Sequence, residues 1–331
     1  MLELALAEAA QYGEARSKSV IGKAMGKFPE LRASAKEVMS LIDEVVVEAN
    51  QMDPKDLEPF LPRKKEKPKE DVVKELPTLQ NSDKVVLRFA PGPSGPLHLG
   101  HTRALALNNY YRNRYAGKLI LRLEDTNPNA IDPEAYDMIQ SDMEWLGINS
   151  DEVVVQSDRM ETYYDDMRTI LSKGGAYVTN SEAEHWRDLK KRSEAHPDRN
   201  RDSDVQLNEF EALLSGGEGI VVIKTDLEDP NPALRDFVAF RVVESPHPRQ
   251  KDKYRLWPLY NYAVAIDDYR LGVTHVLRGK DHLNNTLKQK WIYKYMDWDE
   301  PEYIHYGLVS IPDTNLKTSN IRESISKNEF S

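Results

Sequence analysis

Hydrophobic and polar positions follow a helical period at the start of the chain. In residues 33–50 the apolar positions recur at spacings of four, three and four, at Val38, Ile42, Val45 and Ala49. This period places one apolar stripe on one helix face, so we expect residues 1–51 to form a helical extension. Residues 52–82 contain several prolines and the basic run RKKEKPKE, which predicts a solvated linker.

The pattern changes at residue 84, where short apolar, β-branched runs begin to alternate with helical patterns. The predicted strands are VVLRFA (85–90), LILRLE (119–124) and EVVVQ (152–156). The predicted helices are 102–115 and 159–171, and between them a helix that begins after Asp132. Asp132 would be its N-cap, and Pro133 would occupy its first position. Strands and helices that alternate at this spacing indicate a parallel α/β sheet.

A less regular segment interrupts this alternation. Residues 176–255 combine a highly charged stretch with the strand-like runs GIVVIKTD and DFVAFRVV. Alternation then returns, with predicted strands at 273–279 and 302–311 and a helix at 281–296. The sequence therefore predicts the α/β class: a Rossmann-like parallel-sheet domain in two halves, 83–175 and 256–331, with an inserted α+β domain at 176–255 and the N-terminal helical extension.

Composition excludes several kinds of chemistry. The chain has 331 residues and no cysteine, which excludes disulfides, thiolate metal sites and a cysteine nucleophile. His185 and His196 lack the spacing of zinc ligands, so we expect no zinc. The net charge of −10 argues against nonspecific coating of nucleic acid but permits a local basic face. No basic leader or apolar run of about 18 residues is present, so we expect a cytoplasmic protein with no membrane partner.

The strongest local signal is PSGPLHLGH (93–101), which lies between a predicted strand and a predicted helix. Its glycines allow a ligand to approach the backbone, and a helix N-terminus offers free N–H groups to phosphate. His98 and His101 lie at the same edge and can donate to phosphate oxygens, whether neutral or protonated. Taken alone, the short segment more often forms a proline-stiffened turn that carries two surface histidines.

Four segments in this order resemble a known family. They are RFAPGPSGPLHLGH, LRLEDTNP (121–128), WPLYNYAVAIDD (257–268) and GVTHVLRGKDH (272–282). They resemble the class I aminoacyl-tRNA synthetases, in the glutamyl/glutaminyl branch, and the N-terminal helices resemble the extension of archaeal glutamyl-tRNA synthetases. The resemblance implies that ATP, with Mg²⁺, activates an amino acid as its adenylate. The 2′-OH of the terminal tRNA adenosine then takes up the aminoacyl group.

The resemblance also implies roles for residues that match the family motifs. For ATP these are His98, Gly100, His101, Asp281, His282 and Lys317. For the amino acid they are Arg88, Ala90, Glu124, Tyr260 and Arg278. Glu124 would accept from the α-ammonium group, the two arginines would meet carboxylates, and His98, His101 and Lys317 would act on the reacting phosphates. Carboxylate and guanidinium groups suit these tasks because their hydrogen bonds are charge-assisted and directional.

Arg278 favours glutamate over glutamine as substrate. The resemblance implies that glutamyl enzymes carry an arginine there and glutaminyl enzymes a small uncharged residue. The implied partner is tRNA(Glu), and charging of tRNA(Gln) together with a tRNA-dependent amidotransferase stays open. The sequence is also compatible with a glutaminyl-tRNA synthetase, with a tRNA-binding paralogue without catalysis, and with a short paralogue that glutamylates a modified tRNA base.

Two features depart from the family pattern. The family's mobile KMSKS loop corresponds here to PDTNLKTSNIRES, in which only Lys317, Thr318 and Ser319 resemble it. The family also continues beyond this point with a helical junction and an anticodon-binding region, so we expect the chain to be a fragment. By the same analogy, segment 176–255 would hold the tRNA acceptor stem. Its candidate phosphate contacts are Arg187, Lys190, Lys191, Arg192, Arg199 and Arg201.

Overall fold

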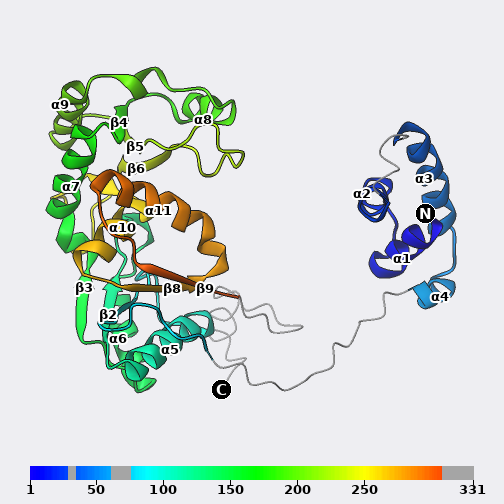
Figure 1. Cartoon of the computed structure of the whole chain (residues 1–331), viewed down its shortest axis with the longest axis horizontal. Helices are drawn as coiled ribbons and strands as arrows, with labels where there is room; N and C mark the ends of the chain where they lie inside the picture. The colour runs from blue at the N-terminus through cyan, green and yellow to red at the C-terminus, as the bar shows by residue number, and fades with distance from the viewer. Residues whose placement is uncertain (29–34, 61–75, 308–331) are drawn as a thin grey trace. The chain divides into compact units, whose positions relative to one another are not determined.

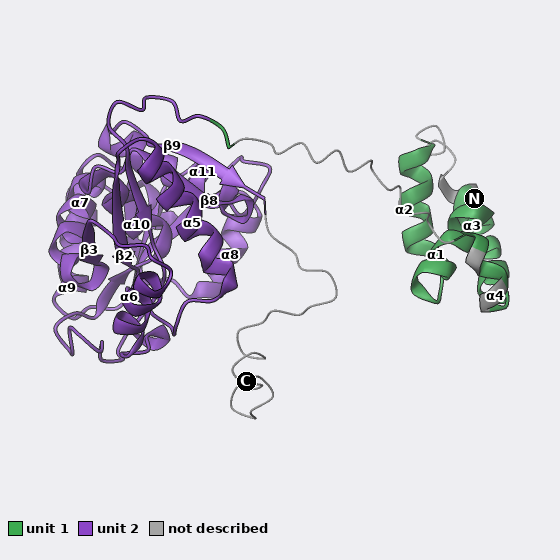
Figure 2. Cartoon of the chain, turned by 90° about the horizontal axis from the view of Figure 1, so that it is seen from below, with its two compact units in different colours: residues 1–77 green, residues 78–331 purple. Residues whose placement is uncertain are grey.

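The chain divides into two compact units, Met1–Pro77 and Thr78–Ser331 (Figure 2). The computed structural model describes residues 1–28, 35–60 and 76–307. Each unit buries its own apolar core. Within the described ranges, no helix is long and apolar enough to cross a membrane.

The small unit is helical and packs around one apolar core. Its longer helices are α1 (Leu2–Tyr12), α2 (Ser17–Lys27) and α3 (Ala35–Asn50). On α3 the buried stripe consists of Val38, Ile42, Val46 and Ala49. The predicted Val45 is half-buried and packs against the same core, and its neighbour Val46, which was not predicted, is the more deeply buried of the two. Spacings of four, four and three fit one helix face equally as well as spacings of four, three and four do. The helical period alone therefore does not show which of Val45 and Val46 is more deeply buried.

The predicted linker, 52–82, is too long at both ends. The short helix α4 (Pro54–Leu57) and a 3₁₀ turn (Glu58–Phe60) follow α3, and Leu57 is buried in the small core. Helix α4 can begin at Pro54, because the first residue of a helix does not need the N–H that proline lacks. At the other end Leu79 is buried in the large unit, and its N–H donates to the hydroxyl of Tyr115 over 2.9 Å. Residues 61–75 lie outside the described ranges.

Parallel strands occur in both the early and the late part of the large unit, as the alternation predicts (Figure 1). One sheet has the order β1-β2-β3, and a second parallel pair is β8-β9. The strands are β1 (Val86–Phe89), β2 (Lys118–Leu123), β3 (Glu152–Val155), β8 (His275–Gly279) and β9 (Glu302–Tyr306). The N–H of Thr274 donates to the carbonyl of Val86 over 3.0 Å, which places β8 beside β1. The carboxyl ends of β1, β2 and β8 therefore share one edge.

Four helices of this part have boundaries close to the predicted ones: α5 (Leu99–Arg114), α6 (Ala135–Trp145), α7 (Met160–Ser172) and α11 (Leu283–Met296). A further helix, α10 (Tyr260–Arg270), was not predicted. Helix α5 begins three residues earlier than predicted, because His98 caps it. The predicted cap at Asp132 was wrong: α6 begins at Ala135, and the Asp132 carboxylate instead accepts from the N–H of Glu134 over 3.0 Å in the preceding turn.

The remaining elements build an antiparallel sheet with the order β4-β5-β6-β7. Its strands are β4 (Ala176–Thr179), β5 (Ile220–Ile223), β6 (Phe237–Val242) and β7 (Leu256–Pro258). The helices beside it are α8 (Ala183–Lys191) and α9 (Ser203–Leu214), and 3₁₀ turns lie at Pro128–Ala130, Gln156–Arg159, Pro197–Asn200 and Lys280–His282. Buried residues of this sheet share one core with α7, α10 and α11 (Figure 1). The limits of an inserted domain at 176–255 stay a prediction.

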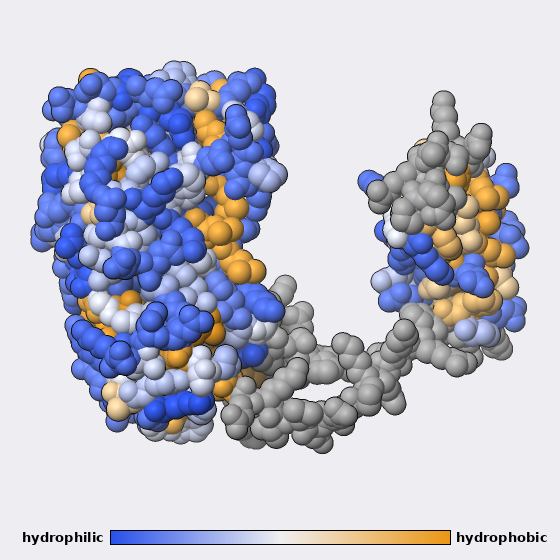
Figure 3. Space-filling view, viewed as in Figure 1, coloured by the Kyte–Doolittle hydropathy of each residue, from blue (hydrophilic) through white to orange (hydrophobic). Residues whose placement is uncertain are grey.

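Hydrophobic side chains also gather on an outer face of the small unit (Figure 3). The exposed apolar residues of α3 are Met39, Leu41 and Val47. They lie outside the buried stripe of this helix, so their removal costs little packing.

Replacing Ile42 by alanine should destabilise the small unit by about 2–5 kcal/mol, because a fully buried side chain leaves a cavity behind. The matched control is Leu41→Ala on the same helix, where the side chain is 46% exposed and the change should stay within about 0.5 kcal/mol. Hydrogen exchange of the α1–α3 amides measures both free energies. Equal exchange in the two variants would contradict the assigned face of α3.

Candidate active site

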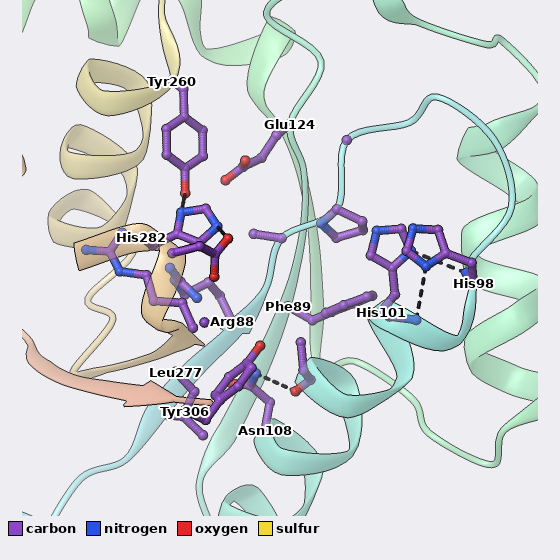
Figure 4. A pocket seen from close by; sticks show the side chains of 18 residues that line it. Arg88, Phe89, His98, His101, Asn108, Glu124, Tyr260, Leu277, His282 and Tyr306 are labelled. Atoms are coloured by element: carbon purple, nitrogen blue, oxygen red, sulfur yellow. Dashed lines mark hydrogen bonds and ion pairs between the residues drawn. The ribbon is translucent and has the colours of Figure 1, made fainter. Parts of the chain in front are cut away.

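A cavity of about 390 Å³ opens at the carboxyl ends of the parallel strands. Arg88 lies on β1, Glu124 directly follows β2, and Arg278 lies on β8 (Figure 4). The N-terminus of α5 forms another wall, with His98 and His101. Ligands of open α/β sheets bind at this edge, because strand ends and helix N-termini converge there.

Ten of the eleven residues predicted for the site line this one cavity. They are Arg88, Ala90, His98, Gly100, His101, Glu124, Tyr260, Arg278, Asp281 and His282. The eleventh, Lys317, lies outside the described residues. The shared cavity shows that these side chains can meet one ligand set, whereas the role of each residue stays a prediction.

Both histidines are oriented by the start of α5. His98 Nδ1 accepts from the N–H of Gly100 over 3.0 Å, and His101 Nδ1 accepts from the N–H of His98 over 3.3 Å. Their rings stack with centroids 3.8 Å apart. Because each Nδ1 is an acceptor, each ring carries its hydrogen on Nε2 and can offer that N–H to a ligand.

The charge state of His101 follows from its burial. Burial disfavours the imidazolium, and the neighbouring His98 adds to this effect, so the pKa of His101 falls to about 4. His101 is therefore a neutral hydrogen-bond donor at neutral pH. Gly100 is needed between the two rings, because a Cβ there would lie 2.8 Å from Cε1 of His98. This residue allows the rings to stack across the first turn of the helix.

Charged side chains form a buried network below the opposite part of the cavity. Asp268 Oδ1 accepts from Arg88 Nε over 3.1 Å and from Arg122 Nη1 over 2.6 Å. Arg122 Nη2 donates to Glu124 Oε1 over 2.9 Å. Burial alone would raise the pKa of Asp268, but the two arginines outweigh it and lower that pKa. For Glu124 burial prevails over Arg122, so its pKa is raised.

Arg278 differs from the other arginines of the cavity because no carboxylate among the described residues pairs with it. Only 5% of Arg278 is exposed, and its Nη2 donates to Thr286 Oγ1 over 2.6 Å. The guanidinium lies 4.9 Å from the ring centroid of Tyr303. Its Nε and Nη1 are buried and reach no acceptor in the described part of the chain. Burial, with Arg88 nearby, lowers the pKa of Arg278. A buried cation in this state favours an anionic ligand.

Tyr260 and His282 form the remaining polar wall (Figure 4). The Tyr260 hydroxyl lies 3.1 Å from Nδ1 of His282, which also meets the side-chain amide of Asn285 at 3.1 Å. Burial, and then Glu124, raise the pKa of Tyr260 to about 12, so the hydroxyl keeps its proton. Burial also lowers the pKa of His282, although Asp281 opposes the shift. This wall is therefore uncharged apart from the exposed Asp281 carboxylate.

Sequence reasoning missed the residues that support the cavity from below. Arg122 interrupts an otherwise apolar buried strand, and Asp267 and Asp268 are adjacent acids on a helix that is buried on nearly every side. A charge inside a buried element predicts a partner, and this signal could have identified both. Helix α10 itself was missed because its apolar positions show no one-sided stripe.

The arrangement combines two kinds of binding group in one space. Neutral N–H donors at a helix N-terminus suit phosphate oxygens. Two arginines, one acid and a tyrosine hydroxyl suit an amino acid that carries an extra carboxylate. Among the described residues, no three His, Asp or Glu side chains come close enough to hold a metal ion.

Comparison with known proteins identifies the family. Residues 84–328 match the catalytic domain of class I tRNA synthetases of the E and Q type. The chain belongs to this family. The glutamate–tRNA ligase of Methanocaldococcus jannaschii is 47% identical over the whole chain, and that of Thermoplasma volcanium is 44% identical over 99% of it. The chain spans 61% and 62% of the length of these two relatives.

Solved structures support the class I synthetase fold. A glutamate-tRNA synthetase structure from Elizabethkingia anophelis matches with a TM-score of 0.56 and 24% identity. The match covers 75% of this chain and 54% of that one. At this identity the likeness concerns the fold, which agrees with the predicted α/β class and its parallel sheet.

An NMR titration of the imidazole signals tests the assigned state of His101. Its signals should remain those of the neutral ring from pH 8 down to pH 5, because its pKa lies at about 4. Since this folded-state pKa is below the unfolded value, the stability that His101 contributes is present above about pH 6.5 and is lost as the pH falls toward 4. A midpoint near 6.5 would contradict the buried, stacked arrangement.

Proposed function

We propose that this chain carries the catalytic centre of a glutamate–tRNA ligase. The observation that carries the proposal is Arg278, a buried guanidinium without a carboxylate partner among the described residues, in the same cavity as Arg88 and Glu124. The names of the related proteins support the same activity. The proposed reaction joins glutamate to the 2′-OH of the tRNA terminal adenosine through a glutamyl-adenylate.

Charge balance in the cavity favours glutamate over glutamine. Arg88 and Arg122 have Asp268 and Glu124 as partners, whereas Arg278 has no carboxylate partner among the described residues. Glutamate brings a second carboxylate that can pair with Arg278, whereas glutamine has an uncharged amide in its place. Glutamine would leave Arg278 unpaired in a buried site, which costs about 1–3 kcal/mol or more. A glutaminyl enzyme therefore fits the cavity less well.

The residues divide between the two reactants. We assign Glu124 to the α-ammonium group, Arg88 and Arg278 to the carboxylates, and Tyr260 to a hydrogen bond with the amino acid. Ala90 lines the same part of the cavity. The α-carboxylate then attacks the α-phosphorus of ATP in line with the departing pyrophosphate. This step needs positioning more than a protein nucleophile, which suits a chain without cysteine.

At the other end of the cavity, ATP meets the start of α5. Nε2–H of His98 and of His101 would donate to phosphate oxygens as negative charge shifts toward pyrophosphate, and Gly100 leaves room for them. Asp281 and His282 would lie beside the adenosine. Mg²⁺ bound to ATP would neutralise part of the phosphate charge, with water as its other ligands. Lys317 stays a predicted contact of the pyrophosphate.

The candidate tRNA contacts become fewer once their surroundings are known. Arg192 pairs with Asp188 and Glu194, and Arg199 and Arg201 pair with acids of their own segment. Lys190 donates to the Asp236 carbonyl, and burial lowers its pKa to about 8. Exposed Arg187 and Lys191 are the better candidates for phosphate contact. We propose tRNA(Glu) as the partner and a cytoplasmic location. As a further proposal, the protein also charges tRNA(Gln) and works with a tRNA-dependent amidotransferase.

Exchange of pyrophosphate into ATP tests the activity directly. With glutamate and added tRNA, the chain should exchange labelled pyrophosphate into ATP, since adenylate formation is reversible. Glutamine in place of glutamate should support at most a few per cent of that rate. Binding of tRNA without any exchange would instead favour a paralogue without catalysis, and a preference for glutamine would assign the glutaminyl activity.

The Arg278→Met variant should separate function from folding. The apparent kcat/KM for glutamate should fall about 30-fold or more, because loss of one partner of a buried charge pair costs about 2–5 kcal/mol. The melting temperature should stay equal or rise, because a desolvated, unpaired guanidinium is replaced by an apolar side chain. The control is Arg168→Met, a surface arginine of α7, which should leave glutamate use unchanged. Normal use of glutamate by Arg278→Met would refute its assignment.

A further inference from the structure

A single carboxylate, that of Asp268, joins the two ends of the proposed amino-acid site. Its Oδ1 accepts from Arg88 Nε at 3.1 Å and from Arg122 Nη1 at 2.6 Å. Arg122 continues the connection with its second amino group, 2.9 Å from Glu124 Oε1. Side chains from β1, α10 and β2 are thus linked in one row: Arg88, Asp268, Arg122 and Glu124.

Only the two ends of this row reach the cavity. Arg88 and Glu124 line it, whereas Arg122 is fully buried and Asp268 is 1% exposed, and neither belongs to the lining. The inner pair therefore acts on a ligand through the outer pair. Arg122 and Asp268 have few other polar partners among the described residues. Arg122 forms one more ion pair, with Asp267 at 4.0 Å, and Asp268 Oδ2 has no hydrogen-bond partner.

The row has a physical reason. An arginine that can turn freely loses rotamer entropy when it binds a ligand. Arg88 is held before the ligand arrives, because Asp268 accepts from its Nε on the side away from solvent. Glu124 is held in the same way by Arg122. Since both clamps depend on Asp268, the distance between the carboxylate-binding and ammonium-binding ends is set by this one side chain.

The neighbouring acid shows that burial alone does not explain the arrangement. Asp267 is equally buried, but its strongest partners are Gln156 Nε2, Arg159 Nε and Tyr163 Oη, at 2.7–2.8 Å. None of these residues lines the cavity. Asp267 therefore ties α10 to the region that begins α7, and Asp268 binds Arg88, which lines the cavity, and Arg122. Two adjacent aspartates of one helix thus have separate tasks.

We propose that Asp268 is a positioning residue for glutamate, which acts through Arg88 directly and through Arg122 on Glu124. The proposal rests on the proposed function, because it concerns the same amino-acid site. It assigns to Asp268 an effect on glutamate and none on ATP. The histidines and Gly100 at the start of α5 share no hydrogen bond with this row.

The test uses Asp268→Asn in the full chain with added tRNA. Asparagine keeps an acceptor oxygen but removes the charge that holds two arginines. The KM for glutamate in pyrophosphate exchange should rise about ten-fold or more, the size expected when a charge-assisted hydrogen bond is weakened. The KM for ATP should stay within about two-fold. Equal rises in both values would overturn the proposal, because a merely structural defect affects both substrates.

The matched control is Asp166→Asn on α7, which removes another buried charge that pairs with Arg270 and shares no ion pair with the row. It should lower the melting temperature and leave both KM values within about two-fold. Arg122→Lys serves as a second variant should Asp268→Asn not fold, since one ammonium cannot bridge Asp268 and Glu124 as the guanidinium fork does. It should raise the KM for glutamate alone. A glutamate KM unchanged in Arg122→Lys, or raised equally by Asp166→Asn, refutes the role of Asp268.

Failure of this proposal is distinguishable from failure of the proposed function. A wild-type chain that supports no exchange with glutamate refutes the function itself. A wild-type chain that exchanges normally, with no selective change of glutamate KM in Asp268→Asn, refutes only the positioning role.

Discussion

The structure of this site depends on one constraint: a charge removed from water needs an opposite charge or enough hydrogen bonds. Arg122 satisfies it with opposite charges: Asp268 and Glu124 lie on its two amino groups, and Asp267 lies 4.0 Å from its Nε, which makes no hydrogen bond to the described residues. Arg278 satisfies it only in part, with one hydroxyl and one aromatic ring. The contrast between these two buried arginines separates a group that supports the site from a group that awaits a ligand.

The two ends of the cavity differ in the charge of their polar side chains. The end proposed for the amino acid has full charges, held in place by a buried network. The end proposed for phosphate has imidazoles at the start of α5, where the helix contributes about half a positive charge of its own. Neutral donors can stabilise a developing charge without a permanent ion pair that would slow the departure of pyrophosphate. This division matches a reaction in which the amino acid is retained and a phosphate group leaves.

The sequence predicted the parallel α/β class, most element boundaries to within a few residues, and a set of residues that meets in one cavity. These successes depended on signals with a strict geometry, such as the strand, glycine turn and helix around His98 and His101. The errors have a physical cause as well. Helix α10 is buried on nearly every side and shows no stripe, and Val45 and Val46 fit the same helical period. The supporting pair, Arg122 and Asp268, was missed because its partners are distant in sequence and meet only in the fold.

The connection between β7 and α10 has a consequence for the packing of the large unit. Strand β7 ends at Pro258, and α10 begins two residues later at Tyr260, with the N–H of Leu259 bonded to the Ala239 carbonyl of β6. The edge of the antiparallel sheet is thus mechanically continuous with a wall of the amino-acid cavity. Because buried residues of both belong to one densely packed core, the edge of the sheet and the start of α10 hold each other in place. The position of the Tyr260 hydroxyl therefore depends on packing far outside the cavity that it lines.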